Sequence, residues 1–378
     1  MRAILVGVKT NRDKEKDLNY SLSELEGLVK ALDGDVLGKL YQVKHQPEAS
    51  TYIGKGKASQ LKELADGINA DTIVFDVELS PVQIRNLENI TEREVLDRTD
   101  LILKIFENRA KTKQAKLQVE LAILEHELPR AYNQKGKELS RIGGRGKIRG
   151  AGEHIGEIKI REIKKRITKI KKELKEIEKQ RREQRKRRNK NPNIIKVALV
   201  GYTNVGKSSL LKRLAKKDVF VSNRLFATLD TKTSSIYFPD IDKRILLTDT
   251  VGFVKDMPEE LMDAFSTTLD ELREADLILH VEDISDENWE DKLKEVEKIL
   301  KKLKLYNRDT LVILNKIDKL IPSQEYLEDD FLTVEDKKAL IVSVDKGWNL
   351  DRLIKYLHDF AKNYKFINRF EKNNFDED

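Results

Sequence analysis

The sequence contains no cysteine, which excludes disulfide bonds and thiolate metal sites. Histidine occurs five times, at spacings that do not suggest a metal site. Apolar runs long enough to cross a membrane are missing too, since a span takes about 20 consecutive residues. The first residues, MRAILVGV, lack the length and the small-residue cleavage site of a signal peptide. We therefore expect a cytoplasmic protein without a membrane span.

The chain is long and strongly charged. Its 378 residues suggest two or three domains, and 39% hydrophobic with 37% charged residues is typical of a globular protein. The formal net charge of +7 is modest for this length. The positions of the basic residues are therefore more informative than their sum.

Residues 1–105 are predicted to form a small α/β domain. Short apolar runs predict strands, and apolar residues at helical spacing predict helices between them. The expected strands are 3–8, 36–43 and 71–75, and the expected helices are 22–32, 58–68 and 82–90. Strands and helices that alternate in this way form a parallel sheet with helices packed against it.

A glycine-lysine loop, Gly54-Lys55-Gly56-Lys57, opens the second of these helices. Its backbone N–H groups and lysines suit the phosphate of a nucleotide or of an RNA backbone. A tight turn into a helix would need the glycines for its backbone alone. The sequence leaves both interpretations open.

Residues 106–192 are predicted to form a helical hairpin. One long helix is expected over 102–128, and a second follows after an interruption. Apolar residues recur in both at spacings of three and four: Leu117, Leu121, Leu124, Leu128, Ile160, Ile163, Ile167, Ile170, Leu174 and Ile177. Two such helices joined by a loop bury their apolar seams on each other as an antiparallel pair.

Two basic segments flank the second helix. The loop at 143–153 is rich in glycine and basic side chains, which suits either contact with the phosphate backbone of RNA or a flexible solvated linker. The dense basic run at 181–190 attracts nucleic acid electrostatically. Because few aromatic residues lie nearby, RNA recognition would depend on backbone charge and shape.

The strongest motif follows this helix. A β-branched apolar run leads into GYTNVGKS at 201–208, and a helical pattern comes next, which is the order that a P-loop requires. Its glycines allow backbone N–H groups to point at phosphate oxygens. Lys207 is expected to reach the β and γ phosphates, and the Ser208 hydroxyl to bind Mg²⁺. The motif predicts a nucleotide triphosphate site in a domain spanning 193–362.

Three later residues complete a predicted γ-phosphate sensor. Asp249 ends a predicted strand and fits the carboxylate that holds Mg²⁺ through water. The N–H of Gly252 fits a contact to the γ phosphate, and Thr228 would close over Mg²⁺ and the γ phosphate from a mobile loop. Mg²⁺ is therefore the expected cofactor, with Ser208, Thr228 and Asp249 as its ligands.

The next motifs predict guanine as the base. The carboxylate of Asp318 can accept hydrogen bonds from N1–H and the N2 amine, a donor pair that adenine lacks. Asn315 would brace the loop and the base, and the stem of Lys316 would cover the ring. The segment Ser343-Val344-Asp345 can offer a backbone N–H to guanine O6. The four motifs in this order favour GTP over ATP.

Phe253 departs from common GTPase chemistry. Many P-loop GTPases carry a glutamine here to orient the attacking water, and phenylalanine cannot hydrogen-bond to water. We therefore expect slow intrinsic hydrolysis that a partner accelerates. Lys207, Thr228 and Gly252 are the predicted catalytic residues. The full predicted nucleotide site is Gly201, Asn204, Val205, Gly206, Lys207, Ser208, Ser209, Phe226, Asp249, Asn315, Lys316, Asp318, Ser343 and Val344.

Motifs along nearly the whole chain resemble the HflX family of GTPases. They are GKGK at 54–57, LSPVQIRNL at 79–87, DRT at 97–99, LQVELA at 117–122, RGAGE at 149–153, FATLD at 226–230 and DTVGF at 249–253. Only the acidic tail at 363–378 lies outside the likeness. The resemblance implies GTP-dependent binding to the large ribosomal subunit and action on stalled or idle ribosomes. It also implies that the hairpin loop reaches into ribosomal RNA.

The chain departs from the family pattern at two places. Ala151 and Thr231 stand where the family commonly has proline, and His154 follows where its loop motif continues differently. Two rival functions remain open: an RNA-binding scaffold in which GTP orders the switch loops and hydrolysis is incidental, and an RNA-remodelling ATPase that uses the loop at 54–57. A monomer is expected, because the hairpin seam is satisfied within one chain.

Overall fold

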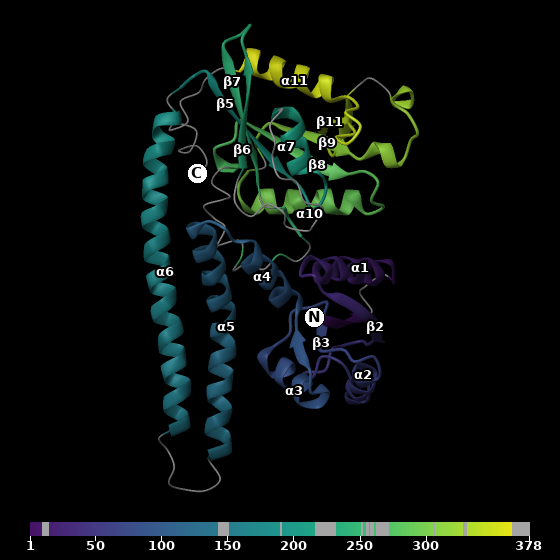
Figure 1. The fold of residues 1–378 in the computed structure, drawn as a ribbon, viewed down its shortest axis with the longest axis vertical. Helices are drawn as coiled ribbons and strands as arrows, with labels where there is room; N and C mark the ends of the chain where they lie inside the picture. Colours follow the sequence, from purple (N-terminus) through teal and green to yellow (C-terminus); the bar gives the residue numbers. More distant parts are fainter. Residues whose placement is uncertain are drawn as a thin grey trace. The chain divides into compact units, whose positions relative to one another are not determined.

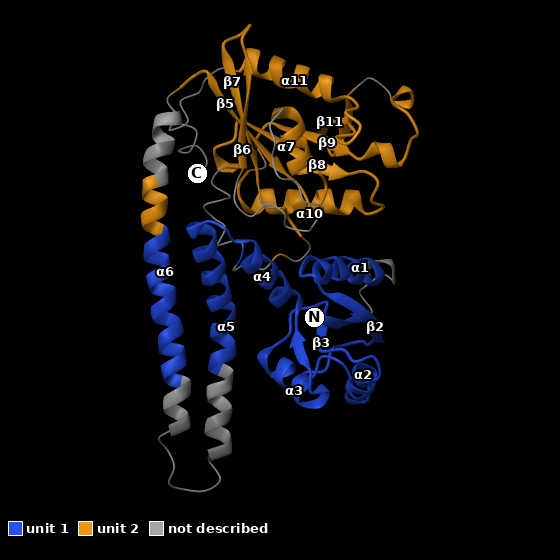
Figure 2. Cartoon of the chain, in the orientation of Figure 1, with its two compact units in different colours: residues 1–174, 258–261 blue, residues 175–257, 262–378 orange. Residues whose placement is uncertain are grey.

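A computed structural model describes residues 1–9, 15–142, 151–189, 191–215, 232–250, 252–254, 257, 261, 272–305, 307–327 and 331–364. The chain divides into two compact units, which Figure 2 shows in different colours. The N-terminal unit is residues 1–174 with 258–261, and the C-terminal unit is residues 175–257 with 262–378. Among the described residues, no helix combines the length and the apolar character needed to cross a membrane.

The N-terminal unit contains the predicted parallel sheet. Its strand order is β2-β1-β3-β4, and the three pairings are all parallel. The strands are β1 (Arg2–Lys9), β2 (Asp35–Val43), β3 (Thr72–Phe75) and β4 (Glu94–Leu96). The helices are α1 (Glu15–Ala31), α2 (Lys55–Gly67), α3 (Pro81–Thr91) and α4 (Arg98–Arg109). Strand β1 is buried on both faces, which explains its continuous apolar run. The sequence did not predict β4, whose three residues are too few to show a period.

The single helix predicted over 102–128 is wrong, because the chain breaks after α4. Helix α4 ends at Arg109, Ala110 is extended with φ −65° and ψ 111°, and α5 runs over Lys113–Ile142. The Thr112 hydroxyl accepts a hydrogen bond from the Ala115 N–H at 3.1 Å and so caps the new helix. Helix α4 contacts α1, β3 and β4. The break lets α4 stay on the sheet while α5 turns away to pair with α6.

Helices α5 and α6 (Ala151–Asn189) lie side by side in opposite directions (Figure 1). Ala131, Ile160 and Ile163 form a buried cluster between them, with Leu124, Leu128 and Ile167 packed against it. Arg166 of α6 donates two hydrogen bonds to Glu120 of α5, at 2.5 and 2.6 Å. The predicted antiparallel hairpin is confirmed. Helix α6 begins at Ala151, so the last three residues of the loop predicted at 143–153 are helical; residues 143–150 lie outside the described part.

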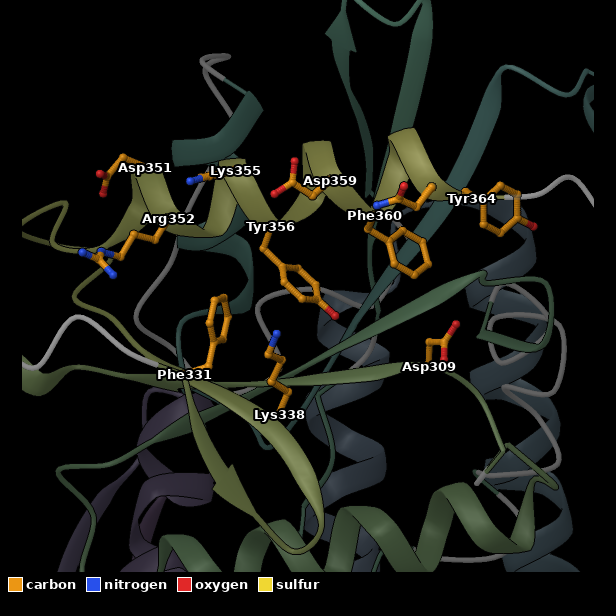
Figure 3. A pocket seen from close by; sticks show the side chains of 11 residues that line it. Asp309, Phe331, Lys338, Asp351, Arg352, Lys355, Tyr356, Asp359, Phe360 and Tyr364 are labelled. Atoms are coloured by element: carbon orange, nitrogen blue, oxygen red, sulfur yellow. The ribbon is translucent and has the colours of Figure 1, made fainter.

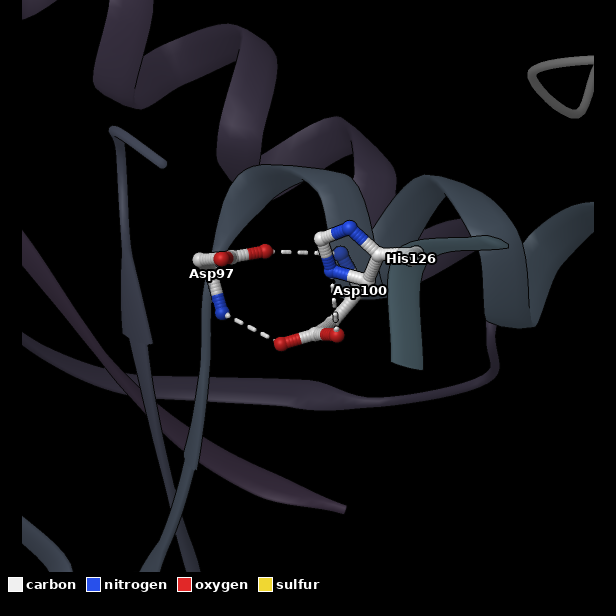
Figure 4. Close-up of side chains that lie close together, drawn as sticks. All are labelled: Asp97, Asp100 and His126. Atoms are coloured by element: carbon white, nitrogen blue, oxygen red, sulfur yellow. Dashed lines mark hydrogen bonds and ion pairs between the residues drawn. The ribbon is translucent and has the colours of Figure 1, made fainter. Parts of the chain in front are cut away.

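A buried charged cluster joins α4 to α5 (Figure 4). Arg130 donates to Asp100 at 2.8 and 3.0 Å and to Asp97 at 3.2 Å, and His126 Nε2 lies 3.2 Å from Asp100. Ligand atoms of Asp97, Asp100 and His126 lie within 4.8 Å of one another, a grouping that the histidine spacing did not predict. The Arg130 guanidinium supplies the positive charge that a metal ion would bring.

Burial and the neighbouring Asp100 carboxylate raise the pKa of Asp97 to about 6. Burial also acts to raise the pKa of Asp100, but hydrogen bonds from His126 and Arg130 outweigh it and lower this pKa to about 2. Burial disfavours the charged form of His126, and its hydrogen bond to Asp100 reverses the sign and raises its pKa. The protonation state of each of these three side chains therefore depends on the charged groups beside it.

The C-terminal unit is built on a seven-stranded sheet in the order β10-β11-β9-β8-β5-β7-β6. The five central strands are parallel, and β6 and β10 are antiparallel edges. The strands are β5 (Ile194–Val200), β6 (Lys232–Phe238), β7 (Lys243–Asp249), β8 (Leu277–Asp283), β9 (Thr310–Asn315), β10 (Leu332–Val334) and β11 (Lys337–Ile341). Helices α7 (Lys207–Ala215) and α11 (Leu350–Asn363) contact β7, and α10 (Trp289–Lys302) contacts β8. This is the predicted P-loop GTPase architecture, and it gathers the carboxyl ends of β5, β7, β8, β9 and β11 at one edge.

Candidate nucleotide site

The P-loop backbone is shaped by residues with positive φ. Gly201 has φ 142°, Asn204 has φ 64° and Gly206 has φ 106°, after which α7 begins at Lys207. A Cβ on Gly201 would lie 2.0 Å from the Val281 carbonyl oxygen of β8. Only glycine fits there, because the loop passes against the backbone of a neighbouring strand.

Gly206→Ala should raise the dissociation constant for GDP at least about tenfold, since positive-φ strain adds to a collision. A Cβ at this position would lie 2.3 Å from Asn315 Nδ2, which braces the loop. The matched control is Gly56→Ala, where a Cβ meets no atom within 4 Å. Titration calorimetry with GDP should show normal affinity for the control. Equal affinities for the two variants would contradict this account of the loop.

Lys207 lies folded against the loop that precedes it. Its ammonium group donates to the carbonyl oxygens of Gly201 at 3.0 Å and Tyr202 at 2.6 Å. Burial lowers the pKa of Lys207 to about 8, although the carboxylates of Asp249 and Glu282 act in the opposite direction. A Cβ on Gly252 would lie 3.0 Å from Lys207 Nζ, so the two predicted catalytic residues are neighbours.

Two of the three predicted metal ligands meet. The Ser208 hydroxyl, in the first turn of α7 beside Ser209, donates to Asp249 Oδ2 at 2.6 Å. Asp249 is fully buried at the end of β7, where it lies beside Leu199 of β5. Two further residues predicted for this side of the site, Thr228 and Phe226, lie outside the described residues.

Asn315 ties the base side of the site to the P-loop. Its amide nitrogen donates to the Val205 carbonyl at 2.8 Å, and its oxygen accepts from the Val344 N–H at 3.0 Å. The side chain is 3% exposed. The Val344 N–H, one of the backbone donors in the segment predicted to contact guanine O6, thus has a partner within the protein.

Lys316 and Asp318 are held on the same side. Lys316 has φ 67°, and its ammonium group donates to the Asn204 carbonyl at 2.7 Å. The hydroxyl of the buried Ser343 donates to Asp318 Oδ1. The residues predicted to read guanine therefore converge on the P-loop from β9 and from the segment after β11.

Phe253 contacts the P-loop through its backbone. Its N–H donates to the Gly201 carbonyl at 3.1 Å, and its carbonyl accepts from the Thr203 N–H at 2.8 Å. Its ring is 2% exposed and belongs to the core cluster of the C-terminal unit. The ring therefore packs as a core side chain.

Sequence reasoning missed two residues at this site. The Tyr202 hydroxyl donates to Glu295 of α10 at 2.6 Å, which fixes the loop from outside. Asp283 ends β8 and accepts from Lys316 at 2.6 Å. The sequence did contain a signal for Asp283, because it is a polar residue at the carboxyl end of a buried apolar strand. Ligands of parallel sheets bind at that edge.

The glycine-lysine loop at 54–57 lies at the start of α2, as expected. The Gly54 N–H donates to the Gln42 side chain at 3.0 Å. One N–H group that a phosphate would need is therefore paired within the protein.

A pocket of about 910 Å³ lies elsewhere in the C-terminal unit. Its lining includes Tyr356 and Phe331, whose ring centres lie 5.5 Å apart, and Lys338 Nζ lies 4.4 Å from the centre of the Phe331 ring (Figure 3). Asp309, also in its lining, directly precedes β9. The pocket is thus at the amino end of that strand, and none of the predicted nucleotide residues lines it.

Family models match three parts of the chain. Their descriptions are "GTP-binding GTPase N-terminal" over residues 19–107, "GTP-binding GTPase Middle Region" over 109–188 and "50S ribosome-binding GTPase" over 196–316. A crystal structure of SsGBP with GDP is 28% identical, with a TM-score of 0.50, and the match covers 96% of this chain and 98% of that one.

Curated relatives named GTPase HflX match most of the chain. The relative from Alkalihalophilus pseudofirmus is 42% identical over 90% of this chain and 78% of its own length. That from Flavobacterium psychrophilum is 39% identical over 100% and 88%, and that from Escherichia coli is 37% identical over 84% and 74%. With the P-loop, the buried Asp249 and the Asn315–Asp318 corner in place, these matches show that the chain belongs to the HflX family of GTPases and is a GTP hydrolase.

Proposed function

We propose that GTP is hydrolysed by in-line attack of water at the edge where Lys207, Ser208 and Asp249 meet. Lys207 would exchange its carbonyl partners in the P-loop for the β and γ phosphates, since its ammonium group already points into the loop. The Gly252 N–H would bind the γ phosphate, and Thr228 would close over it. Asn315, Lys316 and Asp318 would select guanine.

Mg²⁺ fits this donor set. Ser208 and Asp249 present two oxygen atoms 2.6 Å apart, and hard cations of this kind prefer oxygen ligands. Thr228 would supply a third oxygen. When bound, Mg²⁺ would neutralise negative charge on the β and γ phosphates.

We further propose that the partner is the large ribosomal subunit and that the protein acts on stalled or idle ribosomes. The family model that matches residues 196–316 is described as a 50S ribosome-binding GTPase. Helix α6 supports an RNA contact by its charge. Its exposed basic side chains include Lys159, Arg161, Lys164, Lys165, Lys169, Lys172, Lys175 and Lys179. Such a surface attracts a phosphate backbone.

Phe253 supports dependence on a partner. Its buried ring carries no group that could orient water, so isolated protein should turn over GTP slowly. Bound ribosomal subunit would supply the missing positioning. A cytoplasmic location and a monomeric state belong to the same proposal, as does the division into domains 1–105, 106–192 and 193–362 with a tail at 363–378.

GTP turnover should rise at least about tenfold when purified large ribosomal subunits are added, because water positioning alone is a substantial catalytic factor. The rise should shrink as salt increases, since counterion release drives binding to RNA. Lys207→Ala should abolish turnover under all conditions. The measurement is phosphate release at two salt concentrations, with and without subunits.

The same assay separates the rival functions. Absence of turnover at saturating subunits would favour the RNA-binding scaffold. ATP turnover that survives Lys207→Ala would favour an ATPase at 54–57. Slow GTP turnover indifferent to subunits would remove the ribosome from the proposal.

A further inference from the structure

Asp283 uses its two carboxylate oxygens for different tasks. Oδ1 accepts hydrogen bonds from the Ser285 N–H at 3.1 Å and the Ser285 hydroxyl at 2.5 Å, which forms the turn that leaves β8. Oδ2 accepts from Lys316 Nζ at 2.6 Å. The turn fixes the carboxylate, and the carboxylate then fixes the lysine.

Lys316 is held at both sides of its ammonium group. One hydrogen bond goes to Asp283, and the other, at 2.7 Å, goes to the Asn204 carbonyl in the P-loop. The Lys316 and Asp283 side chains are only 20% and 17% exposed, so solvent screens the pair weakly. Asp283 pairs in register with Asn315 at the ends of the adjacent parallel strands β8 and β9, and Lys316 is the next residue after Asn315.

A lysine side chain has four rotatable bonds and loses much rotamer freedom when it is fixed. If Asp283 already holds Lys316 before the nucleotide arrives, the side-chain entropy is lost on folding and does not weaken nucleotide binding. The ammonium group of Lys316 therefore points at the P-loop. The apolar part of the side chain lies between the end of β9 and that loop. That stem is the surface which the proposed function assigns to the guanine ring.

We propose that Asp283 is a positioning residue for nucleotide binding: it holds the Lys316 stem as a preformed wall for the purine base and so slows release of GDP and GTP. This inference rests on the proposed placement of guanine beside Lys316. It goes beyond that placement by assigning the wall to a residue outside the four GTPase motifs.

The test is a double-mutant cycle on release of a fluorescent GDP analogue, followed by stopped flow. Asp283→Ala should accelerate release about tenfold, in the range measured for coupled neighbours. In a Lys316→Ala background the same change should have little further effect, because the carboxylate acts through the lysine. Ser285→Ala, which removes one turn hydrogen bond and keeps the charge, should give a smaller acceleration.

Glu297→Ala is the matched control. Glu297 of α10 also accepts a hydrogen bond from a lysine, Lys337 of β11, and the side chains of Glu297 and Lys337 are only 14% and 27% exposed. Its replacement should leave release unchanged. Thermal melting of each variant shows whether the fold is retained.

Two results would overturn the inference. Unchanged release in Asp283→Ala would show that the wall forms without it, and equal acceleration with and without Lys316 would show a role in the turn alone. Unchanged release in Lys316→Ala is a different failure, because it would remove guanine from this lysine and with it the proposed base site.

Discussion

Asp318→Asn should weaken GTP binding by about 10³-fold or more, because a site that pairs with two donors rejects a mismatched partner strongly. The carboxylate can accept from both N1–H and the N2 amine of guanine, whereas the amide nitrogen of asparagine would face one of those donors with a donor of its own. The buried Ser343 hydroxyl keeps Asp318 in place, so the side chain cannot rotate away without losing this bond. Competition against a fluorescent GDP analogue measures the loss.

Binding of xanthosine triphosphate tests whether Asp318 recognises the N2 amine of guanine. Xanthine carries an oxygen where guanine has the N2 amine, so the asparagine variant should bind it better than the wild-type protein does. Asp345→Asn is the charge-matched control, because it keeps the backbone of this segment and changes a carboxylate that is 82% exposed and lies 4.0 Å from Lys346 Nζ. GTP affinity within about threefold of wild type in Asp318→Asn would place the base elsewhere.

The sequence was informative about this site because each motif is local. Asp249 and Asn315 both end buried apolar strands, and the P-loop is a contiguous run. Parallel strands bring such ends to one edge whatever the connections between them. Residue type and strand position were thus enough to name the predicted nucleotide residues that the structure brings together.

The partners of those residues were not predictable in the same way. Asn315 braces Val205 from 110 positions away, and Asp283 at the end of β8 reaches Lys316, which follows the neighbouring strand β9. Such pairings depend on sheet order, which periodicity does not encode. The break at Ala110 has a similar cause: the residues on both sides favour helix, and burial of α4 on the sheet outweighs the local tendency to continue.

Arg130→Met should lower the free energy of opening of the N-terminal unit by about 3–5 kcal/mol, the usual cost of leaving a buried charge without its partner. Asp97 and Asp100 are 0% and 11% exposed, and Arg130 binds both. Hydrogen exchange of peptides from α4 measures the loss. Both tryptophans, Trp289 and Trp348, lie in the C-terminal unit, so its unfolding can be followed by fluorescence as an internal reference and should not change.

Arg166→Met is the matched control on the same hairpin. Arg166 also makes two hydrogen bonds to one carboxylate, but its side chain is 40% exposed and that of Glu120 is 38% exposed. Water can solvate the carboxylate that this change leaves behind, so the loss should be much smaller than for Arg130→Met. Similar losses in the two variants would show that packing of the arginine stem, and not charge, carries the effect.

The loss caused by Arg130→Met should also depend on pH. Without the guanidinium, the two carboxylates face each other in a buried site with His126 as the remaining partner of Asp100, and the folded-state pKa of each carboxyl group rises. A carboxyl group whose pKa is raised on folding destabilises the folded state at pH above that value, and the penalty fades as the pH falls below it. The pKa of Asp97 is about 6 even with Arg130 present, so the relevant window begins near pH 6. Exchange corrected for intrinsic rates should therefore show a larger deficit at pH 8 than at pH 5.5, and an equal deficit at the two values would mean that carboxylate repulsion is not what Arg130 relieves.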